Sequence, residues 1–197
     1  MSTLDALEWV HPLGRDEWRA WLGANHATAR GAWFVSWKKA TGRPRLEYAE
    51  AVEEALCVGW VDSLARTVDG ERSRLLMTPR KRGSGWSRPN KERIARLEAS
   101  GLMLPAGIAV VEAARADGSW SALDDVENLV EPDDLRAALD AEPSARANWD
   151  AFPRSAKRGI LEWISTAKRP ETRMRRVEQT AALAAQNIRA NEWRPAR

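Results

Sequence analysis

The sequence predicts an α+β protein: a small antiparallel sheet with a β-hairpin, flanked by helices and followed by an all-helical C-terminal module. Strand-like alternation and a strong turn signal are confined to the first half of the chain, whereas apolar residues at helical spacing continue through the second half. With 197 residues, of which 44% are hydrophobic and 30% charged, the chain can bury an ordinary folded core.

The N-terminal elements follow one another at short intervals. Tryptophans and a leucine at helical spacing predict a helix over residues 15–25. The alternation in "AWFVSWKKATG" predicts a strand. The segment "LEYAEAVEEALCVG" predicts a second helix, which closes on Gly59.

A β-hairpin is expected around Asp69 and Gly70, because this dipeptide separates two apolar runs. Side chains that repeat every two residues share one face of a strand, so Asp62 could face an arginine of the partner strand. Such a pair would be either a structural ion pair beneath a tryptophan or the wall of a ligand pocket. The residues expected to share a face are Trp60, Asp62, Leu64 and Arg66 on the first strand, and Arg72 and Arg74 on the second.

The segment "TPRKRGSGWSRPNKER", residues 78–93, places six basic side chains around one tryptophan. Its second half is expected to start a helix that is N-capped by Ser87. Three interpretations fit: a structural loop, an anion seat built from guanidinium groups and free helix amides, or a grip on single-stranded nucleic acid with Trp86 stacked on a base. The candidate binding residues of this segment are Arg80, Arg82, Trp86, Ser87, Arg88, Asn90 and Lys91.

From residue 105 onward the chain is expected to be helical. An acidic connector within residues 120–131 predicts a boundary between an N-terminal domain, residues 1–120, and a helical module, residues 121–197. Charge alternates in basic, acidic and basic blocks, which could complement one another within the fold or between the subunits of a homo-oligomer, or attract an anionic partner.

Several functional classes lack support in the sequence. The two histidines, His11 and His26, are isolated, so we expect no metal site. Hydrolase and nucleotide-binding motifs are absent, and we expect no cofactor and assign no catalytic residue. A secretory leader and a membrane-spanning run are also absent, so we expect a cytoplasmic protein.

Six landmarks in order carry a family resemblance: "WRAWLGANH", "GAWFVSWKKATG", "YAEAVEEALCVGWVDS", "DGERSRLLMTPRK", the run from "GWSRPNKER" to "ARADGSW", and "AKRPETRMRRVEQT". Over residues 9–187 they resemble the YdeI/OmpD-associated, or bacteriocin-protection, family. The resemblance implies a helical OmpD-associated module from about residue 132 and a link to envelope stress and protection from bacteriocins or cationic peptides. It implies no reaction. The chain departs from the family pattern at Ser63 and at Arg88-Pro89.

Together these observations predict a non-enzymatic stress-protection protein that binds an anionic small molecule or an acidic protein surface. A nucleic-acid-binding protein that uses residues 78–93 is the first alternative. The second is a small enzyme of unrecognised class with Asp62 as its acid or base, so enzymatic activity stays open.

Overall fold

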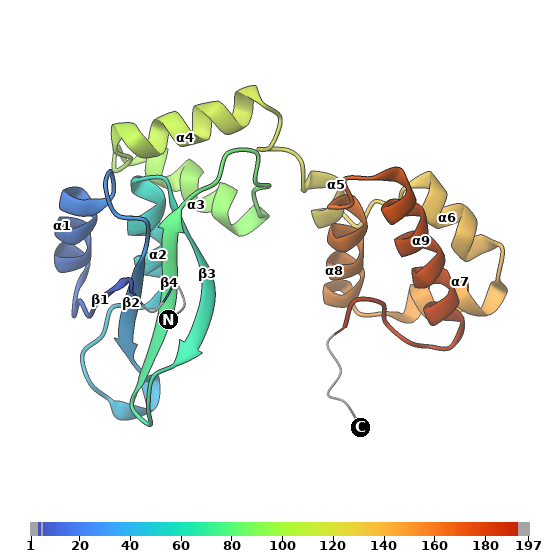
Figure 1. Cartoon of the computed structure of the whole chain (residues 1–197), viewed down its shortest axis with the longest axis horizontal. Coiled ribbons are helices and arrows are strands. Elements are labelled where there is room, and N and C mark those ends of the chain that lie inside the picture. Colours follow the sequence, from blue (N-terminus) through green and yellow to red (C-terminus); the bar gives the residue numbers. More distant parts are fainter. Residues whose placement is uncertain (1–3, 5, 193–197) are drawn as a thin grey trace. The chain divides into compact units, whose positions relative to one another are not determined.

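The computed structural model describes residue 4 and residues 6–192. The chain divides into two compact units, Met1–Ser121 and Ala122–Arg197 (Figure 1). The first unit combines a sheet with helices and the second is built from helices, so the predicted α+β class with a helical C-terminal region is confirmed.

The sheet of the first unit has the strand order β1-β2-β4-β3. It is built from β1 (Glu8–Val10), β2 (Ala32–Trp37), β3 (Trp60–Thr67) and β4 (Arg72–Pro79). The β2–β4 and β3–β4 pairs are antiparallel, but β1 runs parallel to β2. The sheet is therefore mixed, whereas the sequence predicted an antiparallel one. The sequence did not indicate β1, because a three-residue strand is too short to show alternation.

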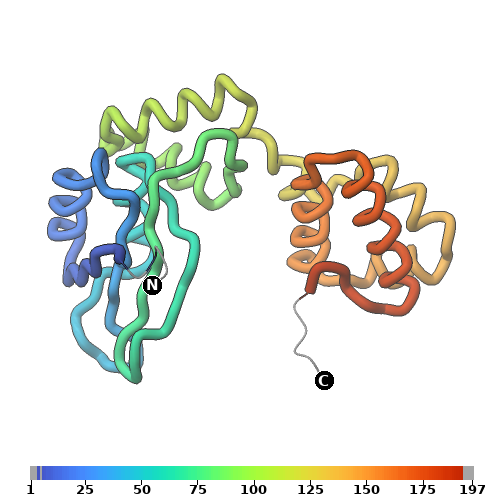
Figure 2. Tube along the Cα trace, in the orientation of Figure 1, coloured from blue at the N-terminus to red at the C-terminus, as the bar shows by residue number. Residues whose placement is uncertain are grey.

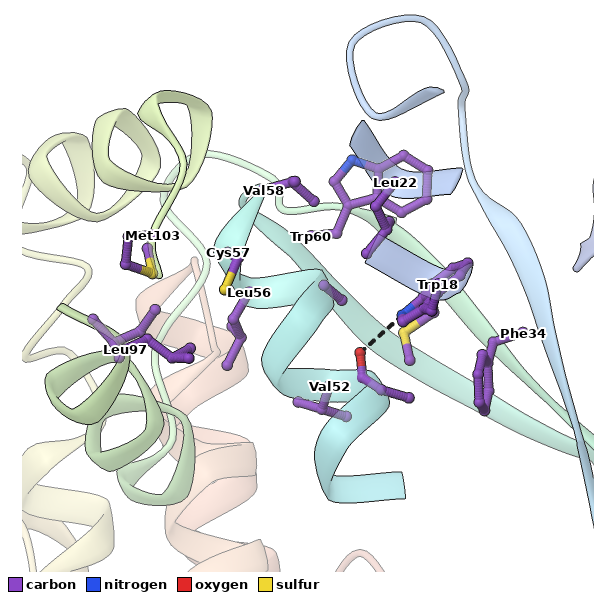
Figure 3. Close-up of a cluster of buried hydrophobic side chains, with 14 of the residues drawn as sticks. Trp18, Leu22, Phe34, Val52, Leu56, Cys57, Val58, Trp60, Leu97 and Met103 are labelled. Atoms are coloured by element: carbon purple, nitrogen blue, oxygen red, sulfur yellow. Dashed lines mark hydrogen bonds between the residues drawn. The ribbon is translucent and has the colours of Figure 1, made fainter. Parts of the chain in front are cut away.

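Helices cover one face of this sheet. They are α1 (Arg15–Asn25), α2 (Tyr48–Cys57), α3 (Arg88–Ala99) and α4 (Pro105–Ala116), and a short 3-10 helix, η1 (Lys39–Thr41), follows β2. Figure 3 shows α2 at the centre of the hydrophobic core, with Trp18 and Phe34 on one side and Leu97 and Met103 on the other. Buried apolar side chains, aromatic on the first side and aliphatic on the second, therefore hold α2 between the sheet and the later helices.

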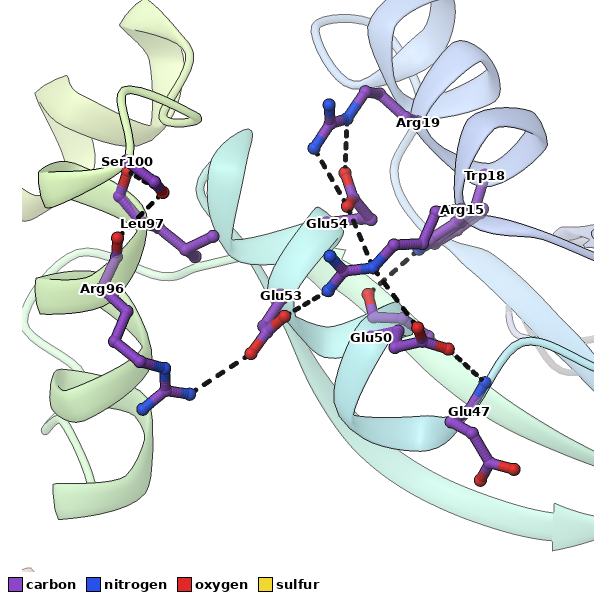
Figure 4. Close-up of polar contacts among 11 residues, drawn as sticks. Arg15, Trp18, Arg19, Glu47, Glu50, Glu53, Glu54, Arg96, Leu97 and Ser100 are labelled. Carbon is purple, nitrogen blue, oxygen red and sulfur yellow. Dashed lines mark hydrogen bonds and ion pairs between the residues drawn. The ribbon is translucent and has the colours of Figure 1, made fainter.

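A charged network on α2 joins three helices (Figure 4). The carboxylate of Glu54 is 2% exposed and accepts two hydrogen bonds from Arg19 of α1, at 2.7 and 3.0 Å. Its neighbour Glu53 binds Arg15 of α1 and Arg96 of α3. The sequence places these two glutamates side by side, and the fold directs both towards arginines of neighbouring helices.

The second unit is built from α5 (Asp124–Glu127), α6 (Asp133–Asp140), α7 (Pro143–Ala151), α8 (Arg154–Ser165) and α9 (Pro170–Ala185) (Figure 2). It encloses its own buried cluster, in which Leu135, Leu139, Trp149, Ile160 and Ile164 are almost completely enclosed. In the described part of the chain, no helix has the length and apolar character that crossing a membrane requires.

Candidate functional site

A hollow of about 310 Å³ lies between the loop that follows β4 and the outer side of α4. We call it the loop–α4 hollow. One side is the basic turn formed by residues 80–84, and the other is a helix surface of small apolar side chains. Its lining residues are Arg80, Lys81, Arg82, Gly83, Ser84, Trp86, Ala109, Val110, Ala113, Ala114, Asp117 and Ser119.

A tight turn shapes the basic side of the hollow. Ser84 donates hydrogen bonds to the Lys81 carbonyl from its main-chain N–H, at 3.2 Å, and from its hydroxyl, at 2.7 Å. Gly83 lies within this turn at φ 74°, in the left-handed region that glycine adopts without steric cost. The turn brings Arg80, Lys81 and Arg82 to one side of the hollow.

Arg80 is the most enclosed cation of the hollow. Its guanidinium carbon lies 3.7 Å from the centroid of the Trp86 ring, and the group donates a hydrogen bond to the Gly85 carbonyl. The buried Nε atom has no hydrogen-bond partner among the described residues. Burial lowers the pKa of Arg80 to about 10, although attraction to Asp62 opposes this shift. A positive charge is thus held where it is poorly solvated.

Arg82 is the open cation of the hollow, with a side chain that is 84% exposed. It lies 3.6 Å from Asp117, which follows the end of α4. The Ser119 hydroxyl, its main-chain N–H and Arg82 hold the pKa of Asp117 below its usual range. Asp117 is therefore an anion at neutral pH, and its charge offsets part of the charge of the three basic residues.

The opposite wall of the hollow has no polar side chain along α4. Ala109, Val110 and Ala113 present small apolar groups, and Trp86 adds a further apolar side chain to the lining. A cationic turn facing an apolar wall suits an organic anion that has both a negatively charged group and an apolar body.

The predicted anion seat at the start of α3 is separate from the loop–α4 hollow and stays a prediction. Ser87 is the N-cap residue, but its side chain makes no capping hydrogen bond. Ser87, Arg88, Asn90 and Lys91 begin α3 and do not line the loop–α4 hollow. The basic segment is therefore divided into two parts with different surroundings, a basic turn and a helix start.

Both tryptophans proposed as ligand contacts are enclosed. Trp86 is 1% exposed, since Arg80 covers its ring and Trp120 packs 5.0 Å from it, so it has no free face on which a base could stack. Trp60 is also 1% exposed and donates a hydrogen bond to the His26 carbonyl at 3.2 Å. Trp60 is thus a core residue and not a pocket wall.

A β-bulge separates Asp62 from the arginines it was expected to face. The pairing shifts from Asp62 opposite Met77 to Ala65 opposite Leu75, so β3 contains one extra residue there. Asp62 therefore faces the helices, whereas Arg66 and Arg74 lie opposite each other on the other face. The expected Asp62–arginine pair across the hairpin is wrong.

Asp62 instead accepts a hydrogen bond from the Tyr48 hydroxyl at 2.9 Å. Burial, followed by this hydrogen bond, raises the pKa of Tyr48. Asp62 does not line the loop–α4 hollow. Within the described residues, no group of three or more histidine, cysteine, aspartate or glutamate side chains is arranged to hold a metal ion.

Sequence reasoning missed the α4 side of the hollow. Ala109, Val110 and Ala113 lack functional groups, so no motif could single them out, and Asp117 and Ser119 read as part of an ordinary helix end. The available signal was indirect: α4 has an alanine-rich surface beside a basic loop that ends the hairpin.

Comparison with protein families separates the two parts of the chain. A family described as "Domain of unknown function (DUF8412)" matches residues 10–110, slightly more than half of the chain. The chain belongs to this family. Most of the hollow lies within the DUF8412 match, although Ala113, Ala114, Asp117 and Ser119 lie just beyond it.

A second family, "Bacteriocin-protection, YdeI or OmpD-Associated", matches residues 128–187. The resemblance found in the sequence is thus confirmed for the C-terminal part, while the N-terminal landmarks fall largely within DUF8412. The match is compatible with a role of the bacteriocin-protection type. No curated protein and no solved structure is detectably similar to the chain.

Proposed function

We propose that this chain is a non-enzymatic protection protein that binds an organic anion in the loop–α4 hollow. The main support is that a cationic turn faces an apolar helix wall across the hollow. In this turn, Arg80 is poorly solvated and Arg82 is exposed. The role in protection rests on the match of residues 128–187 to the bacteriocin-protection family.

Arg80 supplies the physical reason for binding. Its charge is held against Trp86 with an unpartnered Nε, and burial disfavours the protonated form. A carboxylate placed in the hollow would attract this charge at short range and offset the cost of burying it. Arg82 would exchange its weak contact with Asp117 for the same ligand, and the apolar body would lie against α4.

Ligand binding can be tested by thermal unfolding of the full chain with octanoate, inorganic phosphate and octanamide. We expect octanoate to raise the melting temperature, because ligands that bind the folded state stabilise it. Octanamide has the same apolar chain without the charge and should have little effect. Phosphate has the charge without the chain and should act weakly.

Variants locate the effect. Ala109→Leu fills the hollow without changing charge, and Arg82→Gln removes its open cation; both should reduce the octanoate-induced shift. Arg136→Gln, on the surface of α6, is a charge-matched control and should leave the shift unchanged. An octanoate shift that survives Ala109→Leu, or the absence of a shift in the unaltered protein, would contradict the proposal.

The role in protection has its own test. Cells that lack the protein should become more sensitive to a bacteriocin or a cationic peptide, and the unaltered chain should restore survival. If Ala109→Leu restores survival as well as the unaltered chain, the hollow is not needed for protection.

A further inference from the structure

The sheet face opposite the helices carries a row of aromatic and basic side chains that crosses all four strands. Trp9 of β1 lies opposite Trp33 of β2, and Arg74 of β4 lies opposite Arg66 of β3. The Arg74 guanidinium carbon is 4.0 Å from the ring centroid of Trp33 and 4.5 Å from that of Trp9. The Arg66 guanidinium carbon is 5.8 Å from the Trp33 centroid. We call these four residues the Trp–Arg row.

The two arginines of the row are a like-charge pair at directly opposite positions, an arrangement that destabilises an antiparallel sheet. Among the described residues, neither guanidinium has an ion pair or a hydrogen bond, and the buried Nε of Arg74 is unpartnered. Arg66 is exposed and Arg74 is half-buried. The fold therefore holds two adjacent positive charges that an anion from solution can reach.

The other end of the same face provides an internal comparison. There Trp37 is covered by Arg43 at 4.2 Å and Arg72 at 5.9 Å. These arginines are neutralised, since Arg43 pairs with Glu71 at 3.2 Å and Arg72 with Asp69 at 2.7 Å. The same stacking motif thus has acidic partners over Trp37 and none over Trp33, which points to an external anion at the Trp–Arg row.

Trp9 indicates the class of anion. Its side chain is 48% exposed at the edge of the sheet, beside Arg74, so part of the ring is free for a planar group. Guanidinium groups bind phosphate bidentately, and bases stack on exposed aromatic rings. A carboxylate of an acidic protein would use the arginines but leave the ring unused.

We propose that the Trp–Arg row binds single-stranded nucleic acid. Arg66 and Arg74 contact backbone phosphates, and Trp9 stacks a base. This surface shares no residue with the loop–α4 hollow and differs from the basic segment of residues 78–93. The inference therefore stands independently of the organic-anion function.

Fluorescence anisotropy with a labelled single-stranded oligothymidylate tests the assignment on the full chain. Neutralising two phosphates predicts a slope of about −1.4 in log K against log salt, at about 0.7 per phosphate for single strands. Arg66→Gln and Trp9→Leu should each weaken binding about tenfold. Arg43→Gln removes the same charge from an ion-paired arginine over Trp37 and should change affinity less than about twofold.

Thermal unfolding supplies a second readout. Without nucleic acid at low salt, Arg66→Gln should raise the melting temperature because it removes the repulsion between the paired arginines. The oligothymidylate should raise the melting temperature of the unaltered protein and have less effect on Arg66→Gln. Unaltered affinity of Arg66→Gln or Trp9→Leu for the oligothymidylate, or equal losses for Arg66→Gln and Arg43→Gln, would overturn the proposal.

Two further binding measurements distinguish nucleic acid from an acidic protein as the ligand, and the Trp–Arg row from the loop–α4 hollow as the binding surface. Polyglutamate that binds more tightly than the oligothymidylate, with the same loss in Arg66→Gln, would assign the row to an acidic protein and overturn the nucleic-acid proposal. Arg82→Gln should retain oligothymidylate binding. If it does not, the nucleic acid occupies the hollow and not the row.

Discussion

At the residue scale, Cys57 shows how burial determines the chemistry of a single thiol. It lies at the end of α2 and is enclosed by the core. Burial, followed by the nearby charge of Glu54, raises the pKa of the Cys57 thiol to about 11. The unfolded chain releases this proton at lower pH, so stability should fall as pH rises from about 9 to 11 and be insensitive to this group below that window.

The first prediction is that Cys57 is inert in the folded protein. At pH 8 a thiol reagent such as DTNB should label it about a hundredfold more slowly than in urea, since the thiolate is the nucleophile and access requires opening of the core. The double variant Cys57→Ala, Ser100→Cys moves the thiol to an exposed position and should react rapidly under native conditions. Fast labelling of native Cys57 would show that this part of the core opens readily.

The hairpin shows where inference from single residues stops. Its position around Asp69 and Gly70 followed from local turn chemistry, and β3 and β4 flank these residues. The faces did not follow, because strict alternation places Asp62 and Arg66 together and the bulge between Asp62 and Ala65 separates them. A bulge depends on how two strands pair, which the β3 sequence alone does not encode.

At the element scale, the position of α2 depends on a buried acid. Glu54→Gln should lower the free energy of unfolding by about 2 kcal/mol, because it leaves Arg19 without the bidentate partner that its half-exposed guanidinium now has. Glu98→Gln breaks an exposed ion pair between Glu98 of α3 and Arg115 of α4, and should lower the free energy of unfolding by less than about 1 kcal/mol. Urea unfolding of both variants gives the comparison, and equal losses would contradict a special role for Glu54.

The contact between α2 and α4 permits no side chain at Gly107. A Cβ atom there would lie 2.3 Å from the Cys57 carbonyl oxygen, which already accepts a hydrogen bond from the Leu104 N–H at 2.9 Å. Gly107→Ala should therefore destabilise the first unit by about 2 kcal/mol, since backbone must move. Because α4 is one wall of the hollow, octanoate binding should weaken as well.

Gly159 is the matched control for this substitution. It also lies within a helix, α8, but a Cβ atom there would meet nothing within 4 Å. Gly159→Ala should stabilise by about 0.5–1 kcal/mol through helix propensity. Thermal unfolding should thus shift in opposite directions for the two alanine variants, and a loss in both would show that the two sites do not differ in packing.

At the scale of the whole molecule, the acidic block and the C-terminal basic block of the sequence form ion pairs with each other. Arg173 holds Asp134 through two hydrogen bonds, at 2.7 and 2.9 Å, and Arg158 pairs with Glu127 at 2.9 Å. These pairs join the acidic block to the C-terminal basic block inside the second unit. Complementarity within the fold was one of the interpretations that the sequence left open, but the individual partners depend on how α5, α6, α8 and α9 pack.

The site is the part that global sequence properties predicted least. Composition and order indicated the elements, and the basic segment indicated an anion, but the apolar wall of the loop–α4 hollow comes from α4. Ala109 and Ala113 line the hollow only because the fold places them there, since their side chains carry no functional group. The Trp–Arg row likewise joins residues from four strands, and the pairing that brings Trp9 beside Trp33 depends on a parallel strand that the sequence did not show.

Separate buried clusters in the two units predict that each unit folds with its own stability. Leu139 is completely buried in the second cluster, so Leu139→Ala should cost this unit about 3 kcal/mol through lost apolar contacts and a cavity. Isolated fragments 1–121 and 122–197 should each show cooperative thermal unfolding. Leu139→Ala should lower the melting temperature of fragment 122–197. In the full chain, hydrogen exchange should increase for amides of α6 to α9 and stay unchanged for β2 and β4. If Leu139→Ala accelerates exchange equally in both units, they unfold as one cooperative body and the helical unit does not act as a separable domain.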